Sequence, residues 1–174
     1  DINKALLHYY FRSKEKLYEH IFEHLIWNYV NDMLKLLDTN LPTIEFIKTF
    51  VNNYIEFLRE NPKVPMFLLR ELGEGGKTAK KILKKLLAGG NFSITKFITL
   101  LKKGMDNGEI VKSDPVQLVI TLLGSCIFFF IGEPIVMTLL PETENYDREA
   151  FIEERKDAIF KTIVYGLSPR GAEQ

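Results

Sequence analysis

The sequence has only one cysteine, Cys126, so no disulfide can form within the chain. A lone cysteine in an apolar run is usually a small core residue and fits a reducing compartment. Basic and acidic residues number 23 each, which excludes a uniformly basic nucleic-acid coat but leaves a local basic patch open. Strand-like alternation, internal repeats, low-complexity tracts and a secretory signal pattern are also absent. We therefore expect a cytoplasmic, globular protein.

Helical periodicity runs along nearly the whole sequence and predicts an all-α fold. Apolar residues make up 46% of the chain, enough to bury a substantial core. Ser13, Thr43 and Asp114 are typical N-caps, and Asn61-Pro62 is a typical stop. The expected helices cover 14–37, 44–60, 63–72, 77–88, 92–105, 115–131 and 147–167. The sequence Gly132-Glu133-Pro134 is expected at the end of the sixth.

Two short motifs resemble catalytic signatures. GEGGKT, residues 73–78, is similar to the end of a phosphate-binding P-loop, but Glu71 stands where the first glycine of that motif is needed. We therefore predict an ordinary interhelical loop. HIFEH, residues 20–24, matches a zinc-protease spacing, yet no third ligand is evident, so a solvated helix face is the simpler interpretation. We expect no enzyme, no metal and no cofactor.

Two helical segments have the composition of membrane-binding sequences. KTAKKILKKLL, residues 77–87, is a cationic amphipathic pattern, which suits either an anionic membrane surface or a solvated face above a core. Residues 115–132 carry no charge, and this uncharged stretch is nearly as long as a membrane span. Gln117, Thr121 and Ser125 favour a soluble helix that is buried by its own core on one side and by a partner on the other.

The first residues form a short aromatic segment directly before a long helix. Asn3 is a good N-cap, and Lys4 to Tyr10 would make about two turns, too short to be stable without packing. A short helix bearing Lys, His and Tyr suits the major groove of DNA. The capped start of the next helix, with Lys14, suits a backbone phosphate.

The stretch INKALLHYYFRSKEKLYEHIF, residues 2–22, resembles the recognition helix and following helix of the TetR family of bacterial transcriptional repressors. The family signature runs roughly V-s-k-g-t-L-Y-x-Y-F-x-s-K-e-x-L. In register with it are Ile2, Asn3, Lys4, Leu7, Tyr10, Phe11, Ser13, Lys14, Glu15 and Leu17. NGEIVKSDP, residues 107–115, resembles the turn before the family's dimer-forming helix.

The chain departs from the family pattern in two places. His8 replaces the signature tyrosine, so a contact usually made by tyrosine would fall to a histidine whose charge depends on pH. The family's first two helices are missing before residue 1, so we expect further residues upstream. The resemblance divides the chain into 1–20, the end of a helix-turn-helix domain, and 21–174, a ligand-binding and dimerisation domain.

The resemblance also implies roles for individual residues. Base-facing positions would be Asn3, Lys4, Ala5, Leu6, His8 and Tyr9, while Tyr10 and Lys14 would contact the DNA backbone. Segments 114–140 and 147–167 would form a homodimer that matches a palindromic operator. A small apolar or aromatic inducer would bind among the middle helices. Candidate ligand contacts are Met66, Phe67, Arg70, Phe97, Leu101, Cys126 and Phe130.

The leading expectation is thus a bacterial, cytoplasmic, ligand-responsive repressor of all-α fold. One alternative is an all-α carrier of small molecules or lipids, or an interaction module, in which residues 3–11 are merely a packing helix. A second is a peripheral membrane protein that uses residues 77–87.

Overall fold

A computed structural model of the chain describes residues 11–88, 94–139 and 146–167. Within these ranges there are seven helices and no strand, which confirms the all-α prediction. The helices are α2 (Lys14–Leu37), α3 (Thr43–Glu60), α4 (Lys63–Gly73), α5 (Lys77–Ala88), α6 (Ile94–Asp106), α7 (Pro115–Leu139) and α8 (Arg148–Leu167). Six of the seven agree with the expected ranges within two residues, and α7 is the exception.

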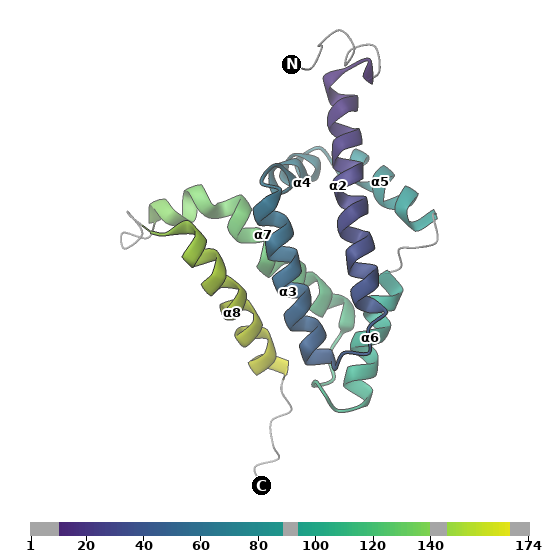
Figure 1. Cartoon of the computed structure of the whole chain (residues 1–174), viewed down its shortest axis with the longest axis vertical. Helices are drawn as coiled ribbons and strands as arrows, with labels where there is room; N and C mark the ends of the chain where they lie inside the picture. Colours follow the sequence, from purple (N-terminus) through teal and green to yellow (C-terminus); the bar gives the residue numbers. More distant parts are fainter. Residues whose placement is uncertain (1–10, 89–93, 140–145, 168–174) are drawn as a thin grey trace.

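Helix α3 is the centre of the molecule (Figure 1). It packs against α2, α6, α7 and α8, and α2 runs antiparallel to it. Its apolar stripe is almost fully covered, and the least exposed members are Phe46, Ile47, Val51, Ile55 and Leu58. Burial of such side chains is worth about 2 kcal/mol each, so α3 anchors the core.

The N-caps at two helix starts are as predicted. Ser13 Oγ accepts a 3.2 Å hydrogen bond from the Lys16 N–H. Asp114 Oδ1 accepts hydrogen bonds of 2.7 and 3.1 Å from the N–H groups of Val116 and Gln117. These short-range signals can be read locally, because a cap and its partners lie within one turn.

The prediction that Thr43 caps α3 is wrong. Thr43 is the first residue of the helix and is 4% exposed, and Pro42 occupies the cap position. The Thr43 N–H instead donates to the Glu109 carboxylate at 2.6 Å. A side chain from 66 residues away thus satisfies a helix-end donor that a local cap was expected to satisfy.

The start of α3 makes a close contact with the end of α6. Gly104 is buried, and a methyl group added there would overlap the side chain of Thr43. Only glycine permits this approach of the two helices. Gly108, with φ of 73°, then turns the chain after α6 so that Glu109 reaches Thr43.

Helix α7 continues through Pro134 to Leu139, so the predicted stop at Gly132-Glu133-Pro134 is not observed. Proline removes one backbone N–H but does not force a helix to end. Glu133 supports this part of the helix, because Arg148 Nε and Nη2 donate to its carboxylate at 2.7 and 3.0 Å and the Tyr146 hydroxyl donates to it as well. These bonds tie the end of α7 to the start of α8.

Candidate functional site

Most of the predicted DNA-facing residues lie outside the described part of the chain. These are Asn3, Lys4, Ala5, Leu6, His8, Tyr9 and Tyr10. Lys14 is described only by its position as the first residue of α2. The structure therefore does not test this assignment.

The turn that leads into α2 is described. Arg12 has φ of 57°, in the left-handed region, and Ser13 behind it is extended and caps α2. The centroid of the Phe11 ring lies 5.5 Å from that of the imidazole of His20, which is in the second turn of α2. Arg12 therefore turns the backbone just before α2, and a non-glycine residue takes this strained conformation.

The P-loop-like segment is an ordinary interhelical loop. The Glu71 carboxylate accepts hydrogen bonds from the N–H groups of Thr78 and Ala79, at 2.8 and 3.0 Å, in the first turn of α5. These are the donors that a bound phosphate would need. A protein carboxylate occupies this position, and the segment is the interhelical loop that the sequence predicts.

The two histidines of the HIFEH segment lie on the surface of α2, whereas Phe22 between them is part of the core. His20 and His24 are exposed, and His24 Nε2 lies 3.3 Å from Asn28 Nδ2. Within the described ranges no group of three His, Cys, Asp or Glu side chains is arranged to hold a metal ion.

The lysines of α5 do not all face solvent freely. Lys81 and Lys85 form ion pairs of 2.6 Å with Glu19 and Glu23 of α2. Lys80 donates to the Gly75 carbonyl at 3.1 Å. The exposed pairs contribute modestly to stability, but they engage charges that a membrane surface would require.

The seven predicted ligand contacts lie on three helices, α4, α6 and α7. Phe97, Leu101 and Cys126 are buried core residues. Phe67 stacks on Phe22 with ring centroids 3.7 Å apart, and Phe130 packs edge-on against Phe129. Met66 is 55% exposed, and Arg70 is exposed and paired with Glu74 at 3.3 Å. These side chains form packing and surface contacts on different helices.

Two open hollows lie between helices elsewhere. The larger, about 1060 Å³, lies at the turn between α2 and α3 and against α6, and it contains Lys96 and Lys103 beside Asp38 and Glu109. Lys96 and Asp38 are already paired at 3.1 Å. The smaller, about 500 Å³, lies between α2 and α3, and we call it the α2–α3 hollow. None of the seven predicted contacts lines either one.

The α2–α3 hollow combines aromatic rings with acidic side chains. Its lining includes the rings of Tyr29 and Phe57, stacked with centroids 4.4 Å apart, and the apolar residues Leu25 and Met33. Its polar lining consists of three carboxylates and three carboxamides: Asp32, Glu56, Glu60, Asn28, Asn53 and Asn61. The ten lining residues include no lysine or arginine.

The charge of Glu56 is balanced from the protein side. Lys156, on α8, and Arg59, at 2.6 Å, both bind its carboxylate. Burial alone would raise the pKa of Glu56, but the bonds from Lys156 and Arg59 outweigh it and hold the pKa below its ordinary value. Glu56 therefore remains ionised and is largely neutralised by its neighbours.

A second buried group in this region is the hydroxyl of Tyr29. Burial raises its pKa well above the ordinary value. The hydroxyl oxygen is buried and has no hydrogen-bond partner among the residues the structure describes. Burial similarly raises the pKa of the Cys126 thiol, to about 12. Both groups are therefore neutral near pH 7.

Sequence reasoning missed the α2–α3 hollow because its polar residues are typical of a solvated helix face. The one available signal was the short connection between two long helices, 38–42, which makes them antiparallel neighbours. The antiparallel arrangement places the middle of α2 beside the end of α3. Asp32 of α2 and Glu60 of α3 therefore line the same hollow.

No protein-family model matches the chain, and comparison with curated proteins finds no relative of it. Identification of its function therefore depends on the residues themselves.

Proposed function

We propose that the chain is a ligand-responsive transcriptional regulator of the TetR type, which binds a palindromic operator as a homodimer in a bacterial cytoplasm. The observation that carries the proposal is the motif at residues 2–17, which is continuous with the sharp turn at Arg12 and the Ser13-capped start of α2. The first N–H groups of a helix favour a bound phosphate, and Ser13 engages only the Lys16 N–H at the start of α2. The all-α architecture is compatible with such a regulator.

Helix α7 supports the dimer in this proposal. Five large apolar residues along it are strongly exposed, namely Val116, Ile120, Phe128, Ile135 and Leu139. They repeat at intervals of four to eight residues, which places them along one side of the helix. Such a continuous apolar surface is unfavourable in water. A second copy of α7 and α8 would cover it in a four-helix arrangement.

The same helix is long and apolar enough to cross a membrane, and less than a quarter of its most apolar window is buried. We favour the dimer because the opposite side of α7 is core. Leu122 and Cys126 are fully buried, and α7 packs against α3, α4, α6 and α8. A membrane span would have to leave these contacts.

Release from DNA would follow from ligand binding to one of two arrangements of the dimer. A ligand can shift this equilibrium only if it binds better to the form whose recognition helices are wrongly spaced. The proposal therefore requires that ligand and operator compete thermodynamically, although their sites lie apart.

The test is selection of bound fragments from genomic DNA by the purified gene product, followed by affinity measurements at several salt concentrations. We expect enrichment of one palindrome and a steep decrease in affinity with salt. Lys14→Ala should reduce the slope of log affinity against log salt by about one unit per protomer, whereas Lys4→Ala should change the preferred sequence. Lys102→Ala, on α6 at the opposite end from the start of α2 (Figure 1), is the matched control and should change neither.

The carrier alternative makes the opposite prediction. A chain that enriches no sequence and shows no salt-dependent DNA binding, even after unfolding and refolding to strip any bound ligand, contradicts the regulator proposal.

A further inference from the structure

The α2–α3 hollow has two carboxylates that remain available to a ligand. Among the described residues Asp32 pairs only with Lys35, and the two side chains are 66% and 78% exposed, so the pair contributes little. Glu60 has no ion-pair partner in the described part of the chain. Since no lysine or arginine lines the hollow, its charge is negative and is not balanced from within.

The aromatic wall of the hollow suits the same kind of ligand. Tyr29 and Phe57 are only partly buried, and aromatic ring faces attract cations while they also pack against apolar groups. The hydroxyl of Tyr29 is buried, so the ring of Tyr29, rather than its hydroxyl, is the part that lines the hollow. Leu25 and Met33 extend the apolar surface.

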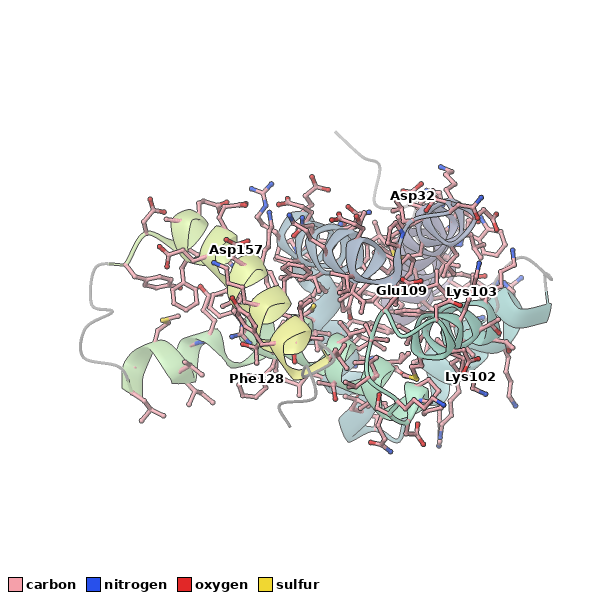
Figure 2. All side chains as sticks on the ribbon, turned by 90° about the horizontal axis from the view of Figure 1, so that it is seen from below. Asp32, Lys102, Lys103, Glu109, Phe128 and Asp157 are labelled. Atoms are coloured by element: carbon pink, nitrogen blue, oxygen red, sulfur yellow. The ribbon has the colours of Figure 1, made fainter. Side chains whose placement is uncertain are left out.

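The size and position of the hollow also fit a small-molecule site. Its volume of about 500 Å³ lies within the range usual for drug-sized ligands. Asp32 is at the opposite side of the molecule from Phe128 on the exposed surface of α7 (Figure 2). Asp32 therefore lies away from the exposed apolar surface of α7 that would form the dimer.

We infer that the α2–α3 hollow binds an organic cation with an aromatic or apolar body. Asp32 and Glu60 attract the positive charge, and the rings of Tyr29 and Phe57 contact the body of the ligand. Binding itself does not depend on DNA recognition. The further statement that this cation is the inducer rests on the proposed function.

The test uses two probes of nearly equal size and shape but opposite charge, tetraphenylphosphonium and tetraphenylborate, titrated into the full chain by calorimetry. We expect the cation to bind at least about tenfold more tightly than the anion. Raising the sodium chloride concentration from 50 to 500 mM should weaken binding of the cation but not binding of the anion.

Variants then localise the site. The double variant Asp32→Asn, Glu60→Gln should bind the cation about tenfold more weakly, and this binding should no longer depend on salt. Phe57→Leu keeps an apolar side chain but removes the ring face, so it should weaken binding of the cation about threefold. Glu154→Gln, an exposed carboxylate on α8, is the control and should leave binding unchanged. Asp32 and Glu60 are exposed, so their substitution leaves the fold intact.

Equal binding of the two probes, or unchanged binding by the double variant, overturns the inference. The proposed function is judged separately with operator DNA. If the cation binds selectively but does not release DNA, the binding site is supported and its role as the inducer site is contradicted. Release of DNA by other ligands, without charge-selective binding here, would support the regulator and overturn the site.

Discussion

Glu71, near the end of α4, accepts a 2.8 Å hydrogen bond from the backbone N–H of Thr78 in the first turn of α5. The side chain is 3% exposed, which is rare for a carboxylate. Burial acts to raise the pKa of Glu71, but the hydrogen bonds from Ala79 and Thr78 outweigh it and hold the pKa below its ordinary value. Glu71 thus ties the end of α4 to the first turn of α5.

Replacement of Glu71 by Ala should lower the free energy of unfolding by about 2 kcal/mol at pH 7, because two helix-end donors lose a charged partner. The folded-state pKa is below the unfolded one, so this stabilisation is present above about pH 4.5 and is lost as pH falls through the folded-state pKa. Urea unfolding at pH 7 and pH 4 should therefore show a smaller difference between wild type and variant at pH 4. Glu74→Ala, an exposed neighbour, is the control, and a difference that does not shrink at pH 4 contradicts the assignment.

Gly104→Ala should destabilise the protein by about 1–3 kcal/mol, because the added methyl group overlaps Thr43 in a packed contact. Gly166→Ala is the matched control, since it is also helical and its added methyl group meets nothing within 4 Å. That substitution should stabilise by about 0.5–1 kcal/mol through helix propensity alone. Thermal unfolding of both variants checks the pair, and a stabilised Gly104→Ala variant would refute the close contact.

Cys126 should be unreactive in the native protein. It is fully buried, and burial raises the pKa of its thiol to about 12, so almost no thiolate exists at pH 8. Ellman's reagent should label less than a tenth of the chains, on the order of what transient unfolding permits, and should label all of them in urea. Rapid complete labelling without urea would show that the α7 core opens.

The exposed surface of α7 should make the chain dimeric. Sedimentation should give twice the chain mass of 20.2 kDa at micromolar concentration. Ile120→Glu should raise the dissociation constant about 30-fold or more, because an unpaired charge at the interface costs about 2 kcal/mol or more. Leu72→Glu, which is 73% exposed on α4, should leave the dimer unchanged. A monomer at tens of micromolar that associates with lipid vesicles would favour the membrane alternative.

Local sequence signals predicted most of the fold. The N-caps Ser13 and Asp114 and the periodic apolar stripe of α3 depend on residues within a turn or two, so their spacing is sufficient to place helices. The cap role predicted for Thr43 was wrong because the carboxylate that accepts from its backbone N–H belongs to Glu109, which is distant in sequence. The fit of Gly104 against Thr43 has the same origin, since no pattern in one helix shows which helix will approach it.

The candidate site was less predictable than the fold. Phe97, Leu101 and Cys126 have the composition of a ligand pocket, but the same composition makes a core, and the structure buries them. Asp32 and Glu60 are typical surface residues in sequence, and only the antiparallel pairing of α2 and α3 brings them to one hollow. The short connection between α2 and α3 indicates that they pair, but the hollow that forms between them depends on the whole packing arrangement and is not encoded in local spacing.

Because α2 is long, a small tilt about the hollow produces a large displacement at the start of the helix. Tyr29, at the α2–α3 hollow, is 15 residues from Lys14, which corresponds to about 22 Å along the helix axis. A tilt of about 10° with its pivot at the hollow would displace the start of α2 by about 4 Å. That displacement is roughly the spacing of one base pair along DNA. In the regulator proposed above, a small shift of the residues around the hollow would therefore move the start of α2 by about the distance between a matched and a mismatched register on the operator.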